Sequence, residues 1–501
     1  MEKKYYVATI PLIVNTKDSF LLQRVFKQVK ECYNAIQNNI LKQYQYITSS
    51  NNYKNANIKE QKKILKNYTI PIKMNRGGIL EKKIFDKYGV ISVLAGRYGK
   101  YYPLLNSQNT KAIANNCYNA WDAFIFGDGK NIHLKKDTDI LSLQTSVSNG
   151  FLIGMNFNLD NNIIQVKVNK HILDLQLKFN NTQYDSYVQQ QINNKEYVCV
   201  SIISKPIRNT IKYELHLTLK GVPYNKARKL GVGKVGVDIG TSSVTSYGTN
   251  LDMSKLSNDE LLKLSKKIRC LNRKLDRSRR IMNPLNYNED GTIKEDDDLI
   301  WKTSNNYITL SNKKKNLFRK AIIQRKTHHL KLANSLLALG DEFNIEKNNI
   351  KSWSEKPKKT VINEKTGKFK SKKRFGKSVL HNAPSEFLNT LKFKVLSLGG
   401  KVNDVSTKLS ATQFDFTSNE FKKHKLNERK VQLSNNNFHT RDAIAAFNLK
   451  HIKENIVNEK NINNYDIEKM NKDYVNFCKH EKEEIQKHMT GKKLTTHSMG
   501  I

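Results

Sequence analysis

Residues 233–248, GKVGVDIGTSSVTSYG, place one carboxylate, Asp238, inside an apolar run rich in β-branched residues. The segment KVGVDIG is typical of a buried strand and SVTSYG of its hairpin partner, with Gly240 easing the backbone at the turn. An unpaired carboxylate in an apolar strand costs free energy. Asp238 is therefore hard to explain by packing alone, and we expect it to hold a ligand.

The composition of the chain indicates a polyanionic partner. The 501 residues include 87 Lys and Arg against 45 Asp and Glu, which leaves a formal net charge of +42 and favours nucleic-acid binding. The five cysteines form no closely spaced pair, which is typical of a reducing compartment. No apolar run approaches the roughly 20 residues that a membrane span requires. We expect a soluble cytoplasmic protein with no membrane partner.

The first half of the chain predicts a β domain interrupted by helices. KKYYVATIPLIV is typical of a strand, and a helical period begins behind Asp18 as a candidate cap. Helical patterns continue to about residue 126, and from there to residue 221 apolar and polar residues alternate. This arrangement indicates a binding role for a β-barrel-like domain (1–17 and 135–228) and an inserted helical domain (18–134).

A long cationic helix is predicted after the hairpin. Ser257 and Glu260 have the spacing of a capping box, and apolar residues recur every three or four positions over 261–275. The other faces carry few acids, so a ladder of salt bridges cannot form there. The cationic face is either merely solvated or follows a phosphate backbone. The second interpretation is favoured, and it makes nucleic-acid ligands of Lys266, Arg269, Arg273, Lys274 and Arg277.

Two further acids follow at the end of a predicted strand and the start of a predicted helix. Glu346 lies at or just past the end of the strand in DEFNIEKNN, and Asp442 lies in the first helical turn after Thr440, a candidate cap. Each alone could be an ordinary strand-end acid or a dipole partner. In order, however, strand with Asp, hairpin, helix, strand with Glu, helix, strand and helix with Asp is the RNase H-like arrangement with long insertions. Three converging carboxylates would suit a pair of Mg²⁺ ions that hydrolyse a phosphodiester.

Two families share the opening motif. VGVDIGTSS is similar to the first phosphate loop of sugar kinases and actin-like ATPases, but those enzymes place it near the N-terminus and need a later DxGxG-type loop, which is missing here. The ordered set VGVDIG, NIEKNNIKSW, FGKSVLHNAPSEF, KLNERKVQL and HTRDAIAAF resembles instead the RuvC-type half of transposon-encoded TnpB nucleases and compact type V CRISPR effectors. This second resemblance extends over roughly residues 230–450, and it favours the nuclease hypothesis over the ATPase hypothesis.

The resemblance implies that Asp238, Glu346 and Asp442 are the catalytic, metal-binding RuvC carboxylates, with Arg441 beside the last of them as a nucleic-acid ligand. It implies two Mg²⁺ ions, for which Mn²⁺ could substitute. It also implies a guide RNA, from a transposon or a CRISPR array, that pairs with the target while the protein reads a short flanking motif in double-stranded DNA and binds the opened single strand.

The domain boundaries follow from the same resemblance. The β domain becomes the wedge domain and the helical domain the recognition domain. The remaining predicted parts are a RuvC-like nuclease domain (229–405 and 440–460) with a basic helical insertion (255–340), an insert at the zinc-ribbon position (406–439) and a helical tail (461–501).

One departure from the family concerns zinc. Relatives usually carry two CxxC-like pairs in the insert at residues 406–439, whereas this insert has no cysteine, and His424 and His439 alone cannot complete a four-ligand site. We therefore expect no zinc. An apolar cluster is predicted to replace the metal, formed by Phe414, Phe416, Phe421, Leu426, Val431 and Leu433.

These features together predict an α+β multidomain protein that acts as an RNA-guided, Mg²⁺-dependent DNA endonuclease in a prokaryotic cytoplasm, associated with the nucleoid when bound to DNA. One alternative is a guide-RNA-dependent DNA-binding repressor with weak or no nuclease activity. Another is a guide-free RNase H-like nuclease or transposase. The three acids favour cleavage over mere binding, and the long N-terminal region has no obvious use in a guide-free enzyme.

Overall fold

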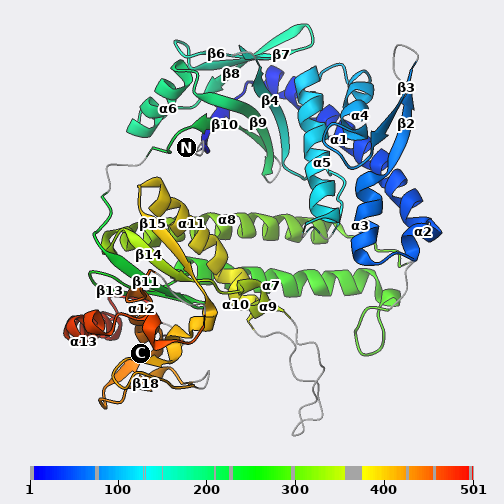
Figure 1. The fold of residues 1–501 in the computed structure, drawn as a ribbon. Helices are drawn as coiled ribbons and strands as arrows, with labels where there is room; N and C mark the ends of the chain where they lie inside the picture. The colour runs from blue at the N-terminus through cyan, green and yellow to red at the C-terminus, as the bar shows by residue number, and fades with distance from the viewer. Residues whose placement is uncertain are drawn as a thin grey trace. The chain divides into compact units, whose positions relative to one another are not determined.

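A computed structural model of the chain forms two compact units, Met1–Asn225 and Lys226–Ile501, which are described separately (Figure 1). The structure describes residues 5–73, 78–127, 129, 131–148, 151–207, 210–224, 229–294, 299–355, 375–424, 428–454, 459–495 and 499. Within these ranges no helix is both long and apolar enough to cross a membrane.

The first unit is built on an eight-stranded antiparallel sheet with the order β5-β4-β9-β10-β1-β8-β7-β6. Among the described residues the edge strands β5 and β6 do not pair with each other, so the predicted β-barrel-like domain is a half-barrel. Burial alternates along β1, as the period of two requires. The strands are β1 (Tyr5–Ile13), β4 (Leu141–Ser148), β5 (Phe151–Leu152), β6 (Met155–Asn158), β7 (Ile163–Val168), β8 (His171–Leu177), β9 (Tyr197–Ile207) and β10 (Thr210–Lys220).

Helices follow the first strand, as predicted, but two elements of this unit were missed. Residues 69–73 pair with residues 79–83 in an antiparallel hairpin, and a helix over residues 183–193 interrupts the β region before β9. The cap of α1 was also predicted wrongly, because the Asn15 side chain accepts the Asp18 backbone N–H and the helix begins before Asp18. The elements are α1 (Thr16–Ser49), α2 (Asn51–Lys54), α3 (Ile58–Asn67), β2 (Thr69–Lys73), β3 (Ile79–Lys83), α4 (Val90–Gly99), α5 (Ser107–Ile125) and α6 (Gln183–Asn193).

The second unit contains a five-stranded sheet with the order β13-β12-β11-β14-β15. The first three strands form an antiparallel meander, while β14 runs parallel to both β11 and β15. The predicted elements follow one another along the chain in the predicted order, but the third strand of the meander, β13, was not predicted. The strands are β11 (Lys234–Ile239), β12 (Ser243–Tyr247), β13 (Leu251–Lys255), β14 (Glu342–Glu346) and β15 (Lys401–Val405).

Helices cover both faces of this sheet. Side chains of α8 (Asn305–Leu336) and α11 (Pro384–Ser397) share a buried cluster with Val235 and Val237 on one face. On the other face α12 (Arg441–Lys450) crosses β11, where a Cβ on Gly236 would lie 1.9 Å from the Ala446 carbonyl oxygen. Glycine in the strand and the predicted small alanines of the helix therefore allow the close approach.

A pair of long helices follows β13 along the chain. The helix α7 (Asp259–Met282) buries Leu261, Ile268 and Leu275 and packs against α8. The predicted capping box is wrong by one residue, because Asn258 is the N-cap and accepts the Leu261 backbone N–H. Asn258 forms this bond in extended backbone geometry, as N-cap residues do.

The end of the chain contains two small hairpins and the long helix α13 (Ile467–Met489). Four of the residues predicted to replace zinc are buried, but they join the core under α12 and α13 and do not form a separate cluster. Phe421 is partly buried against this core, and Leu426 lies outside the described residues. The other elements are α9 (Ile350–Ser354), α10 (Gly376–Asn382), β16 (Phe414–Asp415), β17 (Glu420–Phe421), β18 (Lys430–Gln432) and β19 (Phe438–Thr440), with short 3₁₀ turns between them.

Candidate active site

Two of the predicted acids lie side by side at the carboxyl ends of parallel strands. Strands β11 and β14 are paired up to Val237 and Ile345, and the next residue of each strand is Asp238 and Glu346. Neighbouring strands are about 4.8 Å apart, and alternate residues share a face. Because Val237 and Ile345 belong to the core on the α8 and α11 side, the two acids point to the opposite face, which α12 covers.

The third acid, Asp442, approaches Asp238 and Glu346 from the face of the sheet that α12 covers. Asp442 lies in the first turn of α12. The helix runs antiparallel to β11, since Ala446 and Lys450 lie over Gly236, and Lys234 at the start of the strand donates to the carbonyl of Ile452 beyond the end of the helix. The N-terminus of α12 therefore lies toward the carboxyl end of β11, where Asp238 is. Its positive dipole end favours negative charge there.

The pKa values of the three acids reflect this convergence. Burial is the main cause that raises the pKa of Asp238 well above its usual range, and the charges of Asp442 and Glu346 raise it further. Burial also raises the pKa of Glu346 and of Asp442. Each acid keeps some exposed surface, and the Asp442 side chain is 13% exposed. Like charges in a poorly solvated site repel one another, and a bound cation would relieve this repulsion.

Neighbouring polar groups partly offset these shifts. The Asn348 amide donates a 2.8 Å hydrogen bond to Glu346 Oε2. Arg441 lies 3.4 Å from Asp442 Oδ1, and the charges of Arg441 and Arg429 lower the pKa of Asp442. The sequence analysis missed Asn348 and Arg429. A polar residue two positions beyond Glu346 was a signal for the first, whereas the position of Arg429 depends on the pairing of β18 with β19.

The donor set fits a hard divalent cation in chemical type. Carboxylate oxygens are the ligands that Mg²⁺ prefers, and three of them repel one another here unless a cation or proton intervenes. Within the described part of the chain, no three His, Cys, Asp or Glu side chains are arranged closely enough to hold a metal ion as they stand. The structure thus brings the predicted acids to one end of the sheet without forming a finished coordination cage.

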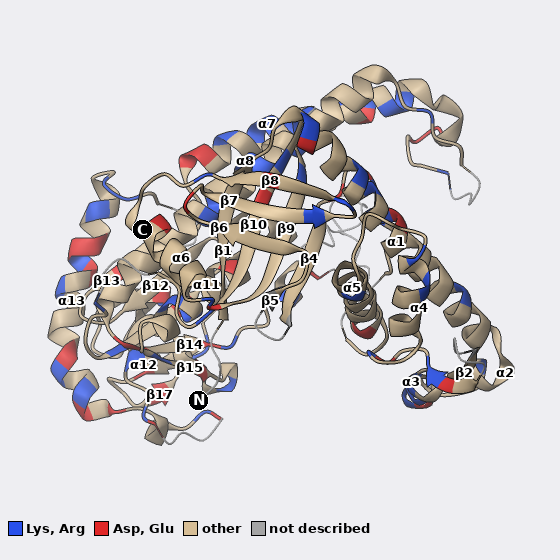
Figure 2. Cartoon of the chain, turned by 90° about the horizontal axis from the view of Figure 1, so that it is seen from above, with Lys and Arg blue, Asp and Glu red and all other residues tan. Residues whose placement is uncertain are grey.

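The predicted nucleic-acid ligands form an exposed cationic face on α7. Lys266, Arg269, Arg273, Lys274 and Arg277 are all exposed. Among the described residues, none of these five forms an ion pair; Asp276 is bound instead by Arg279 and Arg280. Lysine and arginine recur along α7 and α8 (Figure 2). The sixth predicted ligand, Arg441, lies apart from this face, at Asp442.

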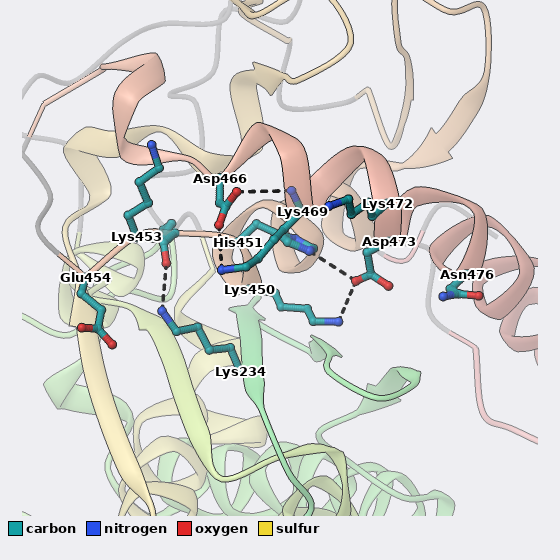
Figure 3. A pocket seen from close by; sticks show the side chains of 11 residues that line it. Lys234, Lys450, His451, Lys453, Glu454, Asp466, Lys469, Lys472, Asp473 and Asn476 are labelled. Carbon is teal, nitrogen blue, oxygen red and sulfur yellow. Dashed lines mark hydrogen bonds and ion pairs between the residues drawn. The ribbon is translucent and has the colours of Figure 1, made fainter.

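A pocket of about 730 Å³ lies at the opposite end of α12, and the sequence analysis did not anticipate it. Lys450 and His451, at the end of α12, both approach Asp473 of α13, at 2.7 and 3.3 Å (Figure 3). Lys450 also donates to the Gly248 carbonyl at 2.8 Å. Burial would raise the pKa of Asp473, but the bonds from His451 and Lys450 outweigh it and hold that pKa well below its usual range. These contacts tie the C-terminal end of α12 to α13.

The insert at residues 406–439 is held by a buried carboxylate. Asp415 is 3% exposed, and its oxygens accept five hydrogen bonds, two from Thr417, two from Ser434 and one from Lys422. Asp415 belongs to the β16–β17 hairpin, and Ser434 follows β18. One carboxylate therefore joins the two hairpins of the insert.

The fold was compared with known proteins. A cryo-EM structure of a Cas12f1–sgRNA–target DNA complex matches with a TM-score of 0.50 and 14% identity, over 87% of this chain and 83% of the Cas12f1 chain. This chain shares the fold of Cas12f1. A second cryo-EM structure, a CRISPR-Cas12f ternary complex, matches at a TM-score of 0.29 with 14% identity, over 88% of this chain and 83% of that one. No family model and no curated protein matches the sequence. The fold shared with the Cas12f1 chain covers 87% of this chain and therefore includes parts of both units.

Proposed function

We propose that this protein is an RNA-guided, Mg²⁺-dependent DNA endonuclease with a single RuvC-type active site. The observation that carries the proposal is the convergence of Asp238, Glu346 and Asp442 from two parallel strands and a helix N-terminus, within a fold shared with Cas12f1. The mutual effect of the three charges on the pKa of Asp238 supports it. A protein that only bound nucleic acid would have no need for this repulsion.

Each residue of the site has a proposed task. Asp238, Glu346 and Asp442 would hold Mg²⁺, which supplies activation of the attacking water and stabilisation of the leaving oxygen. Asn348 orients Glu346 through its 2.8 Å hydrogen bond. Arg441, whose side chain is 17% exposed, partly offsets the raised pKa of Asp442 and offers a cation to a phosphate that enters the site.

The proposed partners are a guide RNA and its target DNA. The net charge of +42 matches a polyanion. The five exposed cations of α7 that form no ion pair within the described part of the chain offer a face to the phosphate backbone of the guide or the heteroduplex. The Cas12f1 protein of similar fold was solved with sgRNA and target DNA. In this proposal base pairing supplies the sequence, and the protein reads a short motif beside the target.

The proposal is tested by sequencing the RNA that copurifies with the full chain and reading the guide segment from it. A plasmid library that carries the matching target beside randomised flanking bases is then incubated with the complex and Mg²⁺. We expect loss of plasmids with a defined flanking motif, and no loss for a mismatched target. Target binding without any cleavage would instead identify a guide-dependent repressor, and the absence of a discrete RNA would contradict the guided mechanism.

A further inference from the structure

A buried glutamate on α13 holds the residues immediately before Asp442. Glu481 is 4% exposed, and its Oε1 accepts hydrogen bonds from the backbone N–H and the hydroxyl of Thr440, both at 2.8 Å. Its Oε2 lies 2.5 Å from His439 Nδ1, and the other ring nitrogen of His439 is bonded to the Tyr474 hydroxyl at 2.8 Å. One carboxylate thus fixes two consecutive residues that lead into α12.

The start of α12 lacks the cap that its sequence predicts. Thr440 is the N-cap residue, but its side chain accepts no hydrogen bond from its own helix, and its hydroxyl donates a hydrogen bond to Glu481 of α13. An N-cap hydroxyl normally orients the first turn of its helix. Here the orientation of the first turn, which carries Asp442, is set from a different helix.

The helix that carries Glu481 is itself firmly held. Glu484, one turn further along α13, is fully buried and accepts the Met253 backbone N–H of β13 at 3.0 Å, as well as a bond from Lys493. Nearer the start of α13, Asp473 contacts Lys450 and His451 at the C-terminal end of α12 (Figure 3). The helix α13 therefore contacts both ends of α12 and is anchored to the sheet that carries Asp238.

We infer that Glu481 is a positioning residue of the active site, which holds Asp442 in place beside Asp238 and Glu346 and so favours metal binding by the three acids. The inference rests on the proposed function, because it concerns the same three carboxylates. Groups that orient metal ligands typically contribute about 10- to 100-fold to metal affinity. Glu481 acts on the ligand Asp442 through the backbone of Thr440 and not by touching the metal.

The test measures Mn²⁺ binding by electron paramagnetic resonance on the full chain with its copurified RNA. The Asp238→Asn variant provides the baseline for ions bound elsewhere, including on the RNA. Glu481→Ala removes all three hydrogen bonds, and we expect the affinity of the remaining site to fall about tenfold or more, by analogy with other ligand-orienting groups. Glu481→Gln keeps an oxygen for both Thr440 bonds and should recover most of the affinity.

The matched control is Glu484→Gln, on the same helix and equally buried, which binds β13 and does not touch the start of α12. Glutamine keeps an oxygen for the Met253 N–H, so α13 stays anchored, but it loses the charge that pairs with Lys493. The variant should therefore lower the melting temperature while leaving Mn²⁺ affinity at the wild-type value. Thr440→Val removes the hydroxyl bond to Glu481 and a weak 4.0 Å contact with the Met253 sulfur, and it keeps the backbone bond to Glu481. It should weaken Mn²⁺ binding and serves if Glu481→Ala does not fold.

The outcomes separate the two claims. Wild-type Mn²⁺ affinity in both Glu481→Ala and Thr440→Val would overturn the positioning role while leaving the proposed function intact. An equal loss of affinity in Glu484→Gln would also overturn it, because the effect would then follow general stability. If the wild type bound no more Mn²⁺ than Asp238→Asn, the proposed function itself would fail, and the positioning role with it.

Discussion

Replacing Asp415 by asparagine removes the acceptor that joins the two hairpins of the insert. The remaining oxygen can still accept the bonds from Thr417, but the new amide nitrogen faces three donors, Lys422 Nζ and the backbone N–H and hydroxyl of Ser434. The hydroxyl can rotate to accept from the amide. The Ser434 backbone N–H can only donate, so it is left without an acceptor. The Lys422 ammonium loses its buried counter-charge.

The magnitude follows from these two losses. A partly buried N–H without a partner costs about 1–2 kcal/mol. The Lys422 side chain is 38% exposed and can be rehydrated, so its lost pairing contributes about 1 kcal/mol, near the value for a surface pair. The variant should therefore lose about 2–3 kcal/mol of unfolding free energy, which corresponds to a fall of roughly 5–10 °C in the melting temperature for a unit of this size.

The effect should depend on pH in a defined direction. Burial would raise the pKa of Asp415, but the bonds from Lys422, Thr417 and Ser434 outweigh it and hold the pKa well below the ordinary 3.8. A depressed pKa stabilises the fold above the unfolded-state value, and that stabilisation is lost as the pH falls toward the folded-state value. The difference between wild type and variant should thus be complete at neutral pH and shrink below about pH 4.

Scanning calorimetry of the full chain at neutral and acidic pH measures this difference. The matched control is Asp404→Asn, which breaks an exposed ion pair with Lys392 and should change the unfolding free energy by less than about 1 kcal/mol. Equal melting temperatures for wild type and Asp415→Asn at neutral pH would refute the view that this carboxylate holds the insert together.

Three further predictions concern other parts of the second unit. Elemental analysis after dialysis against a chelator should find no stoichiometric zinc, and one zinc per chain would show that distant ligands complete a site at the insert. Replacing the exposed residues Arg269, Arg273 and Arg277 of α7 together by serine should reduce the salt dependence of RNA binding. The slope of the logarithm of the binding constant against the logarithm of salt concentration should fall by up to about 0.9 per lost phosphate contact. An unchanged slope would mean that this face is merely solvated. Gly236→Ala should cost about 3 kcal/mol of unfolding free energy, because its Cβ would lie 1.9 Å from the Ala446 carbonyl oxygen. Gly240→Ala is the control and should cost little, because its Cβ would lie 3.4 Å from the nearest atom. Similar melting temperatures for both variants would contradict the close packing of α12 on β11.

The sequence predicted those parts of the second unit in which local pattern and long-range packing agree. The apolar alternation around Asp238 defines β11, and the small residues after Asp442 indicate a helix that approaches a sheet. Helix starts were less predictable, because two polar residues compete for the N-cap position. Asn15 and Asn258 occupy it instead of the residues expected, and nothing in a local pattern distinguishes such close candidates.

The missed features depend on contacts between distant segments. Glu481 and Asp415 look like ordinary charged residues in the sequence, and only the tertiary packing shows that they are buried with several donors. The hairpin of β2 and β3 and the helix α6 interrupt regions of the opposite secondary-structure type. Apolar clusters were easier to anticipate, although the aromatic residues of the insert join a larger core that the sequence does not reveal.

The central claim is that Asp238 serves catalysis and not the fold or the binding of target DNA. Its most direct test is the cleavage rate of a guide-matched plasmid by Asp238→Asn in Mg²⁺, measured beside the affinity for the same target. Asparagine keeps the shape of the side chain and removes the charge that the three-carboxylate site requires. We predict that cleavage falls below detection while target affinity stays within about threefold of wild type, a difference of less than about 1 kcal/mol. Cleavage at the wild-type rate would contradict the assignment of this site.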